Sequence, residues 1–210
     1  SQCHFAQHKQ CVRGDEVNDI YSYICPICWK SSNRVVESRT TIIVSPTSIK
    51  SQWHSEILRH IDDENFKVLV YDGISHGWVS PEEIAKYDVI VTDFNTLSKE
   101  LYFAESVDRE LRNAKKFEYP PSPLVHVKFW RVVLDEAQMV ENANARPSQM
   151  VQTLPAVHRW GCTGTPIERG SIQNLYGLIF FLGIHPYTNF KTFDELWIDY
   201  RSGKPDKLVL

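Results

Sequence analysis

Two adjacent acidic residues, Asp135 and Glu136, directly follow the apolar run 132–134. Ligands of a parallel sheet collect beyond the carboxyl ends of its strands, so a strand over 131–135 carries both acids to that edge. Mg²⁺ prefers oxygen ligands and keeps several waters, so one carboxylate beside nucleotide phosphates suits it. The neighbouring carboxylate can accept a proton from water that attacks the γ-phosphate of ATP. We therefore assign Asp135 to Mg²⁺ and Glu136 to the water.

The residues around this acidic pair decide between two interpretations. An apolar run followed by Asp-Glu also describes a strand that merely ends in solvated acids, and alone it favours neither reading. Gln138 lies two residues further on, and Thr163, Gly164 and Thr165 follow the next predicted strand. Hydroxyl side chains flanking a glycine allow close backbone approach and hydrogen bonds to a phosphate or an acidic turn. The two motifs in this order favour the ATPase site.

Four segments resemble successive motifs of the first RecA-like lobe of Swi/Snf-family ATPases. They are TIIVSPTSIKSQWHSEI, YDVIVTDFNTL, FWRVVLDEAQMVEN and RWGCTGTPIERGSIQNLYGLIFFLGIHPY, which follow one another in this order between residues 41 and 187. The resemblance implies ATP and Mg²⁺ as cofactors and double-stranded DNA in chromatin as the partner. It also implies that Gln138 and Thr165, with Thr163 and Gly164 beside it, couple phosphate state to motion between lobes.

A short turn, residues 45–48, corresponds in this resemblance to the element that grips the backbone of one DNA strand. Its candidate contacts are Ser45, Thr47 and Ser48. A helix that starts after Pro46 directs free N–H groups and the positive end of its dipole toward a phosphate. The alternative is a plain helix cap by Thr47 or Ser48, and both interpretations can hold together.

The first 28 residues contain four of the five cysteines, which indicates metal binding rather than a disulfide framework. The spacing is Cys3-x4-His8-x2-Cys11-x13-Cys25-x2-Cys28. Thiolates and imidazole are natural Zn²⁺ ligands, and a closed site stabilises so small a unit. The segment resembles the later part of a PHD-type zinc finger, which uses eight ligands. The resemblance implies that Cys3, Cys25 and Cys28 share one zinc, and that His8 and Cys11 belong to the other.

Gln138 stands where most Swi/Snf members carry His. In this position the chain resembles the branch of the family that combines the motor with the linker-histone, PHD and RING modules of an E3 ubiquitin ligase. That branch interrupts its motor lobe with a zinc finger just ahead of the segment that begins at residue 41. The resemblance implies a nuclear protein, with a ubiquitin-conjugating enzyme as partner through a RING outside these residues.

Strands that alternate with helices predict an α/β fold with a parallel sheet. The expected strands are 41–45, 67–71, 88–93, 131–135 and 157–162. The expected helices lie near 49–61, 95–103, 146–153 and 171–182, and a further helix is expected to start at Ser80, the N-cap, and Pro81. The domain boundaries are a partial zinc finger over 1–30, a polar linker over 31–40, the motor lobe over 41–190 and a helical region over 191–210. A surface insertion spans 104–123, and Cys162 is expected to be a buried core thiol.

Composition limits the function classes further. The chain has 210 residues, 42% of them hydrophobic, and a net charge of −3, so any DNA contact must come from a local face. No apolar run is long enough to span a bilayer. The phosphate-binding pattern G-x-x-x-x-G-K-[ST] is absent from these residues, and the chain starts at Ser1, so we expect an internal piece that is inactive alone. A motor-like scaffold that hydrolyses nothing is the competing hypothesis.

Overall fold

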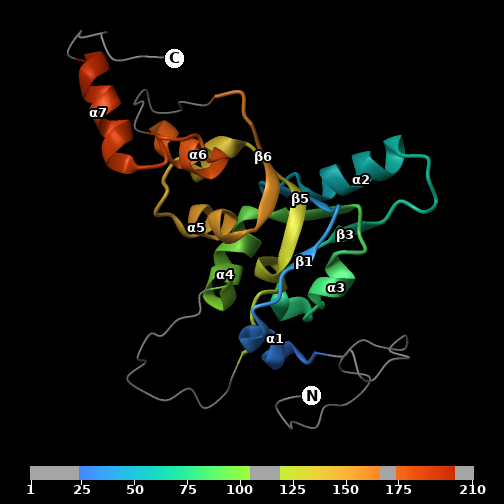
Figure 1. Ribbon diagram of the computed structural model, residues 1–210. Coiled ribbons are helices and arrows are strands. Elements are labelled where there is room, and N and C mark those ends of the chain that lie inside the picture. The colour runs from blue at the N-terminus through green and yellow to red at the C-terminus, as the bar shows by residue number, and fades with distance from the viewer. Residues whose placement is uncertain (1–23, 105–118, 166–173, 202–210) are drawn as a thin grey trace.

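The computed structural model describes residues 24–104, 119–165 and 174–201, which form a parallel sheet with helices packed on it (Figure 1). The sheet has six strands, and they run in the order β1-β5-β2-β4-β3, with β6 paired to β5. Every pairing between the strands is parallel. The strands are β1 (Val36–Glu37), β2 (Thr41–Ser45), β3 (Val68–Val70), β4 (Val89–Asp93), β5 (Val127–Asp135) and β6 (Ala156–Cys162).

From β2 to β6 a helix lies between each strand and the next, as the alternating pattern predicts, and further helices precede β1 and follow β6. They are α1 (Pro26–Ser32), α2 (Lys50–His60), α3 (Pro81–Ile84), α4 (Phe94–Ala104), α5 (Arg146–Thr153), α6 (Leu175–Leu182) and α7 (Phe190–Arg201). Three short 3-10 turns are η2 (Ile74–His76), η3 (Pro123–His126) and η4 (Ala137–Val140). No helix in the described part of the chain is long and apolar enough to cross a membrane.

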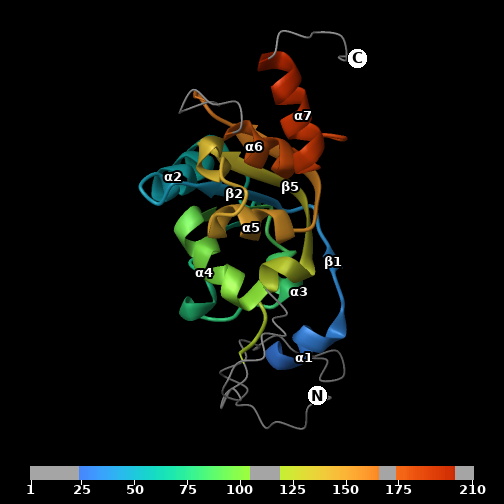
Figure 2. The ribbon, with the colours of Figure 1, turned by 90° about the vertical axis from the view of Figure 1, so that its left-hand side faces the viewer.

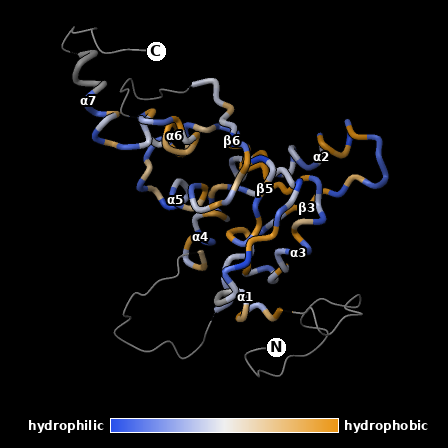
Figure 3. The backbone as a smooth tube through the Cα atoms, viewed as in Figure 1, coloured by the Kyte–Doolittle hydropathy of each residue, from blue (hydrophilic) through white to orange (hydrophobic). Residues whose placement is uncertain are grey.

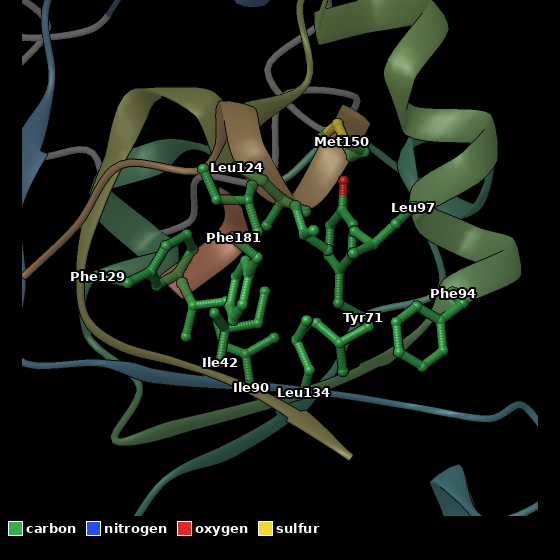
Figure 4. Close-up of a cluster of buried hydrophobic side chains, with 14 of the residues drawn as sticks. Ile42, Tyr71, Ile90, Phe94, Leu97, Leu124, Phe129, Leu134, Met150 and Phe181 are labelled. Carbon is green, nitrogen blue, oxygen red and sulfur yellow. The ribbon is translucent and has the colours of Figure 1, made fainter. Parts of the chain in front are cut away.

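The main hydrophobic core lies on one face of the sheet, where helices α3, α4, α5 and α6 all contribute buried side chains (Figure 4). Side chains alternate between the two faces of a strand, so Ile42, Ile90 and Leu134 all point into this core. The opposite face carries Asp93 and Asp135, and α2 lies against it. Figure 2 shows α2 and the pair α4–α5 on opposite sides of the strands. In Figure 3, hydrophobic residues follow the strands and α6, whereas the loop after α2 is hydrophilic.

Most predicted elements are confirmed, and two of them have the expected bounds. The strand at 41–45 and the helix at 146–153 match β2 and α5 residue for residue. Ser80 is confirmed as the predicted N-cap of the helix that starts at Pro81, because Ser80 Oγ accepts a hydrogen bond from Glu83 N–H at 3.1 Å. The helix that this cap begins, α3, is only four residues long.

Two features differ from the sequence-based expectation. The polar segment 31–40 contains the end of α1 and strand β1, which pairs with the first residues of β5. β1 has only two residues, of which Val36 is partly buried and Glu37 is exposed, so no hydrophobic pattern marks this strand in the sequence. Cys162 is exposed rather than buried, so the expectation of a core thiol is wrong. It lies on β6, most of whose side chains are exposed although the strand pairs fully with β5.

Parts of the predicted domain organisation lie outside the described residues. Cys3, His8 and Cys11 belong to the undescribed segment 1–23, and most of the predicted insertion falls in the undescribed segment 105–118. The helical region predicted over 191–210 is described as far as residue 201, where α7 ends. The boundaries of the zinc finger and the motor lobe stay predictions.

Candidate nucleotide and DNA site

The carboxyl edge of the sheet brings the predicted site residues together. Four neighbouring strands end there, at Ser45, Asp93, Asp135 and Cys162. The register aligns Ser45 with Asp93 and Asp135 with Cys162, so the residues after these strands meet at one edge. The arrangement follows from parallel pairing, which places all carboxyl ends on the same side.

Both oxygens of the Asp135 carboxylate accept a hydrogen bond. Trp53, on α2, donates its indole Nε1–H to Oδ2 at 2.7 Å. The backbone N–H of Glu136 donates to Oδ1 at 3.0 Å. The carboxylate is therefore held in one orientation at the end of β5, where it is half-buried.

Glu136 leaves the strand in a left-handed backbone conformation. Its φ is +52°, which is uncommon for a residue other than glycine and costs conformational energy. β5 ends at Asp135, and Glu136 is the N-cap residue of η4, so the backbone leaves the strand at this residue. Gln138 Nε2–H donates to Glu136 Oε2 at 2.8 Å. Among the described residues no other hydrogen bond to this carboxylate occurs, so Oε1 has no donor there.

The Thr-Gly-Thr turn after β6 is joined to this acidic turn through Gln138. The Thr163 hydroxyl donates to Gln138 Oε1 at 2.6 Å. The same hydroxyl accepts a hydrogen bond from Thr165 N–H at 3.1 Å. A continuous hydrogen-bonded path therefore runs from Thr165 through Thr163 and Gln138 to Glu136. Gly164 is exposed, and a Cβ added to it would meet no atom within 4 Å.

The turn 45–48 separates into one buried and two exposed side chains. Ser45 is fully buried, and its hydroxyl donates to Pro46 O at 3.3 Å. Thr47 and Ser48 are exposed. The Thr47 hydroxyl donates to Asp93 Oδ1 at 3.1 Å and accepts from Asn95 Nδ2–H at 3.0 Å. The turn is thus fixed from behind by β4 and the start of α4.

Helix α2 begins directly after this turn without a capping side chain. Its N-cap is Ile49, which makes no side-chain cap hydrogen bond, so the alternative of a cap by Thr47 or Ser48 is wrong. The first N–H groups of an α-helix have no partner within the helix. With no side-chain cap, those of α2 remain available to an anion, and the helix dipole favours negative charge there.

An ion pair between Lys50 and Asp93 anchors the start of α2 to the sheet. Lys50 Nζ lies 2.7 Å from Asp93 Oδ2, and the Asp93 side chain is 3% exposed. Burial raises the pKa of Asp93, but hydrogen bonds from Lys50 and Thr96 and the lysine charge outweigh it, so the pKa lies below its ordinary value. Burial lowers the pKa of Lys50, but hydrogen bonds and charges of Asp72 and Asp93 outweigh it, so this pKa is raised.

The two described cysteines of the predicted zinc finger lie together at the start of α1. Cys25 is the N-cap, and its Sγ accepts from Cys28 N–H at 3.3 Å. Both side chains are buried. Across residues 24–104, 119–165 and 174–201, no cluster of three or more His, Cys, Asp or Glu side chains is arranged to hold a metal ion. The other three predicted ligands, Cys3, His8 and Cys11, lie outside that part of the chain.

Sequence reasoning misses Trp53, Lys50 and Asp93 as members of this site. Trp53 belongs to the apolar stripe of α2, where its indole N–H carries no signal of its own. Asp93 ends a predicted strand just as Asp135 does, so the same edge argument applied to the strand at 88–93 finds it. Lys50 is one turn before Trp53 on the same helix and has no sequence signature.

Comparison with known proteins identifies the family of this fold and site. The SNF2-related domain matches residues 8–208, which is nearly the whole chain. The chain belongs to the SNF2-related domain family. Its relatives in this family include the E3 ubiquitin-protein ligase SHPRH of Homo sapiens, 42% identical over 194 residues, and that of Mus musculus, 41% identical over 194 residues. The aligned part is 89% of this chain but only 11–12% of those two proteins.

More distant SNF2-family relatives and a solved structure also match. The DNA repair protein RAD5 of Gibberella zeae is 29% identical over 175 residues, which are 77% of this chain and 14% of that protein. The Sulfolobus solfataricus SWI2/SNF2 ATPase core in complex with dsDNA is 24% identical, with a TM-score of 0.49, and the match covers 78% of this chain and 29% of that one. The similarity to SHPRH agrees with the branch of the family that Gln138 and the cysteine-rich start indicate.

Proposed function

We propose that this SNF2-related chain is part of the first motor lobe of an ATP-dependent double-stranded-DNA translocase within a nuclear, chromatin-associated E3 ubiquitin ligase. It supplies the half of the ATPase site that positions Mg²⁺ and the attacking water. The observation that carries the proposal is the pair Asp135 and Glu136 at the carboxyl edge of the sheet, each held by its own hydrogen-bond donor. A scaffold that hydrolyses nothing has no need of this arrangement.

The chemistry of Asp135 fits a magnesium ion. A carboxylate has about four lone pairs, two on each oxygen. Trp53 uses one lone pair of Oδ2, and Glu136 N–H uses one of Oδ1. Each oxygen therefore keeps one lone pair for a hard cation. Bound there, Mg²⁺ would neutralise charge on the β- and γ-phosphates of ATP. The oxygens of Asp135 itself have one role, which is to hold that ion at a fixed place on the sheet edge.

Glu136 is the residue that we propose to take the proton from water. Its Oε2 is held by Gln138, while Oε1 accepts no hydrogen bond from any donor in the described part of the chain. One oxygen therefore fixes the orientation of the carboxylate and the other accepts the proton. Gln138, Thr163, Gly164 and Thr165 form the coupling path, because a change at the phosphate that shifts the Thr-Gly-Thr turn also shifts the donor on Glu136.

The DNA contact that we propose uses the exposed part of the turn 45–48. Thr47 and Ser48 face solvent beside the uncapped first N–H groups of α2, a combination suited to one backbone phosphate. Ser45 is buried, so its role is to support the turn from the end of β2. Such contacts recognise the backbone and not the bases, as a translocase requires.

The zinc and ubiquitin parts of the proposal rest on the relatives and on the cysteine spacing. Cys25 and Cys28 are buried at one end of α1, and Cys3, His8 and Cys11 complete the ligands that this chain offers to Zn²⁺. The curated relatives SHPRH are named as E3 ubiquitin-protein ligases, and we propose a ubiquitin-conjugating enzyme as partner through a RING outside these residues. This chain alone then hydrolyses no ATP and transfers no ubiquitin.

The test is DNA-stimulated ATP turnover by the full-length protein. Glu136→Gln keeps the size and the hydrogen-bonding capacity of the side chain but removes the base, so turnover should fall by at least ~100-fold while ATP still binds. Glu82→Gln, on the surface of α3, is the matched control and should leave turnover unchanged. Normal turnover by Glu136→Gln would disprove its role, and no turnover by the wild type on any DNA would favour the scaffold.

A further inference from the structure

The indole of Trp53 contacts the carboxylate that we assign to Mg²⁺. Nε1 and Asp135 Oδ2 are 2.7 Å apart, which is short for an N–H···O hydrogen bond. Trp53 comes from α2 and Asp135 from the end of β5, 82 residues later in the chain. The only other hydrogen bond to this carboxylate within the described residues comes from the neighbouring backbone N–H of Glu136. Trp53 is therefore its sole side-chain donor there.

An indole is chemically suited to orient a metal-binding carboxylate. It donates one hydrogen bond, accepts none and carries no charge, so it fixes Oδ2 without neutralising the carboxylate. The nearby cation cannot replace it, because Lys50 Nζ lies between Asp72 and Asp93, at 2.5 and 2.7 Å. The Lys50 charge is thus directed to Asp72 and Asp93, and the neutral donor Trp53 is directed to Asp135 at the end of β5.

Trp53 also stands one helical turn from the segment proposed to contact DNA. Ile49 N–H donates to Pro46 O at 3.1 Å, and Trp53 N–H donates to Ile49 O at 3.0 Å. Two backbone hydrogen bonds and one indole therefore connect the turn 45–48 to Asp135. The Lys50–Asp93 pair and the Thr47–Asp93 hydrogen bond join the start of α2 and the turn to the same carboxylate at the end of β4.

We propose that Trp53 is a positioning residue that orients Asp135 for Mg²⁺ and joins this carboxylate to the DNA-contacting turn. The inference rests on the proposed function, because it takes Asp135 as the magnesium ligand and the turn as a DNA contact. A phosphate that pulls on the turn shifts α2, and Trp53 carries that shift to Asp135. Contact with DNA at the turn then alters the nucleotide site directly, within one lobe.

The first measurement is the binding of ADP to the full-length protein as a function of Mg²⁺ concentration, which needs no turnover. Trp53→Phe keeps an aromatic ring and removes the donor. We expect the Mg²⁺ concentration that gives half of the maximal increase in ADP affinity to rise roughly ten-fold, as for other partners of metal ligands. Trp78→Phe is the matched control, since it removes an indole hydrogen bond to Pro121 O, at 3.1 Å, away from the site.

A second substitution of Trp53 separates the loss of the hydrogen-bond donor from a change in packing. Replacing it with 3-benzothienylalanine keeps the bicyclic shape and exchanges only the N–H for sulfur. The same rise in the Mg²⁺ requirement is expected, with an unchanged thermal midpoint. If both versions of Trp53 need no more Mg²⁺ than Trp78→Phe, the positioning role is overturned.

The second measurement is the ratio of ATP turnover with and without double-stranded DNA. We expect both Trp53 versions to lose most of the stimulation that the wild type shows, with ATP affinity at saturating Mg²⁺ retained. If DNA stimulates ATP turnover of both Trp53 versions as much as that of the wild type, the proposed connection between Asp135 and the turn 45–48 is overturned. If the wild type shows no DNA-stimulated turnover, the proposed function is refuted instead. The Mg²⁺ dependence of ADP binding would still test whether Trp53 orients Asp135.

Discussion

Gln138 accepts a hydrogen bond from the Thr163 hydroxyl, with 2.6 Å between Oε1 and Oγ1. The Nε2–H group of the same amide donates a hydrogen bond to Glu136 Oε2 at 2.8 Å. One neutral side chain therefore touches both the proposed base and the turn after β6. An amide suits this position because it donates and accepts at once and cannot ionise.

Removing that amide should disorder the proposed base without unfolding the protein. In Gln138→Ala both hydrogen bonds are lost, and we expect kcat for ATP to fall on the order of 100-fold, as for other small misplacements of catalytic groups. Thr163→Val removes the hydrogen bonds that the Thr163 hydroxyl makes to Gln138 and to Thr165 N–H, but keeps the one between Gln138 and Glu136, so it should cost less. Steady-state ATPase kinetics of the full-length protein measure both. A Thr163→Val variant as slow as Gln138→Ala would contradict the order of effects.

Replacing Gln138 with His should create a pH dependence that the wild type lacks at this position. A neutral imidazole has one donor and one acceptor, so it can keep both hydrogen bonds. Below its ordinary pKa of ~6.5 both ring nitrogens donate, and the ring can no longer accept from Thr163. Turnover of Gln138→His relative to the wild type should therefore fall between pH 8 and pH 6. A ratio that is constant over this range would argue against the hydrogen bond to Thr163.

The sequence predicts the sheet well because buried parallel strands read as short apolar runs. Strand β2 and the core of β5 are such runs, and their positions follow directly. β1 cannot be found in this way, since two partly exposed residues carry no periodicity. The exposure of Cys162 cannot be predicted for a related reason. The sequence of β6 indicates a strand, but it does not indicate which of its two faces is covered by other elements.

The candidate site is partly visible in the sequence for a similar reason. Asp135 and Glu136 follow an apolar strand, so their place at the carboxyl edge follows from the order of residues alone. Their partners do not, because Trp53 is 82 positions away and is brought to Asp135 only by the packing of α2 on the sheet. The left-handed conformation of Glu136 is equally invisible, since no glycine marks it.

Asp93 should stabilise the protein at neutral pH through its charge. It accepts hydrogen bonds from Lys50 Nζ, Thr47 Oγ1, Thr96 N–H and Thr96 Oγ1. Asp93→Asn keeps the shape but removes the charge and one acceptor oxygen. We expect the free energy of unfolding to fall by about 2 kcal/mol at pH 7. Urea denaturation measures it, with the exposed Asp62→Asn as the control.

The same substitution should matter less in acid, and the sign follows from the pKa shift. The pKa of Asp93 is lower in the folded protein than its ordinary value of 3.8, so its contribution is present above that value and is lost as pH falls through the folded pKa. The difference between wild type and Asp93→Asn should therefore shrink below about pH 4. An undiminished difference at pH 2 would show that the charge of Asp93 is not the cause.

Glu100 should be a structural carboxylate rather than a functional one. It is 1% exposed on α4 and accepts hydrogen bonds from Tyr71 OH, Ser122 Oγ and Ile74 N–H. Glu100→Gln places an NH2 group toward some of these donors, so the free energy of unfolding should fall by about 2 kcal/mol. Glu64→Gln, on the exposed loop after α2, should change it by less than about 0.5 kcal/mol. Equal stabilities of the two variants would refute the role of this buried network.

Two glycines near the site should differ in how much their replacement by alanine lowers the free energy of unfolding. In α6, a Cβ on Gly177 would lie 2.0 Å from Val140 O and 2.5 Å from Glu141 O. These are backbone atoms of the turn that follows Gln138, so they cannot move aside cheaply. Gly177→Ala should reduce the free energy of unfolding by about 3 kcal/mol or more. It should also lower ATP turnover, because η4 would have to shift and take Gln138 with it.

Gly164→Ala provides the matched comparison, since a Cβ there meets nothing within 4 Å. Its free energy of unfolding should stay within about 0.5 kcal/mol of the wild type. If the glycine serves close approach of a phosphate to the Thr-Gly-Thr turn, nucleotide affinity should nevertheless fall, because the methyl group occupies the space that the phosphate needs. Urea denaturation and equilibrium ATP binding separate the two effects. A Gly164→Ala protein with normal stability and normal ATP affinity would remove this turn from the nucleotide site.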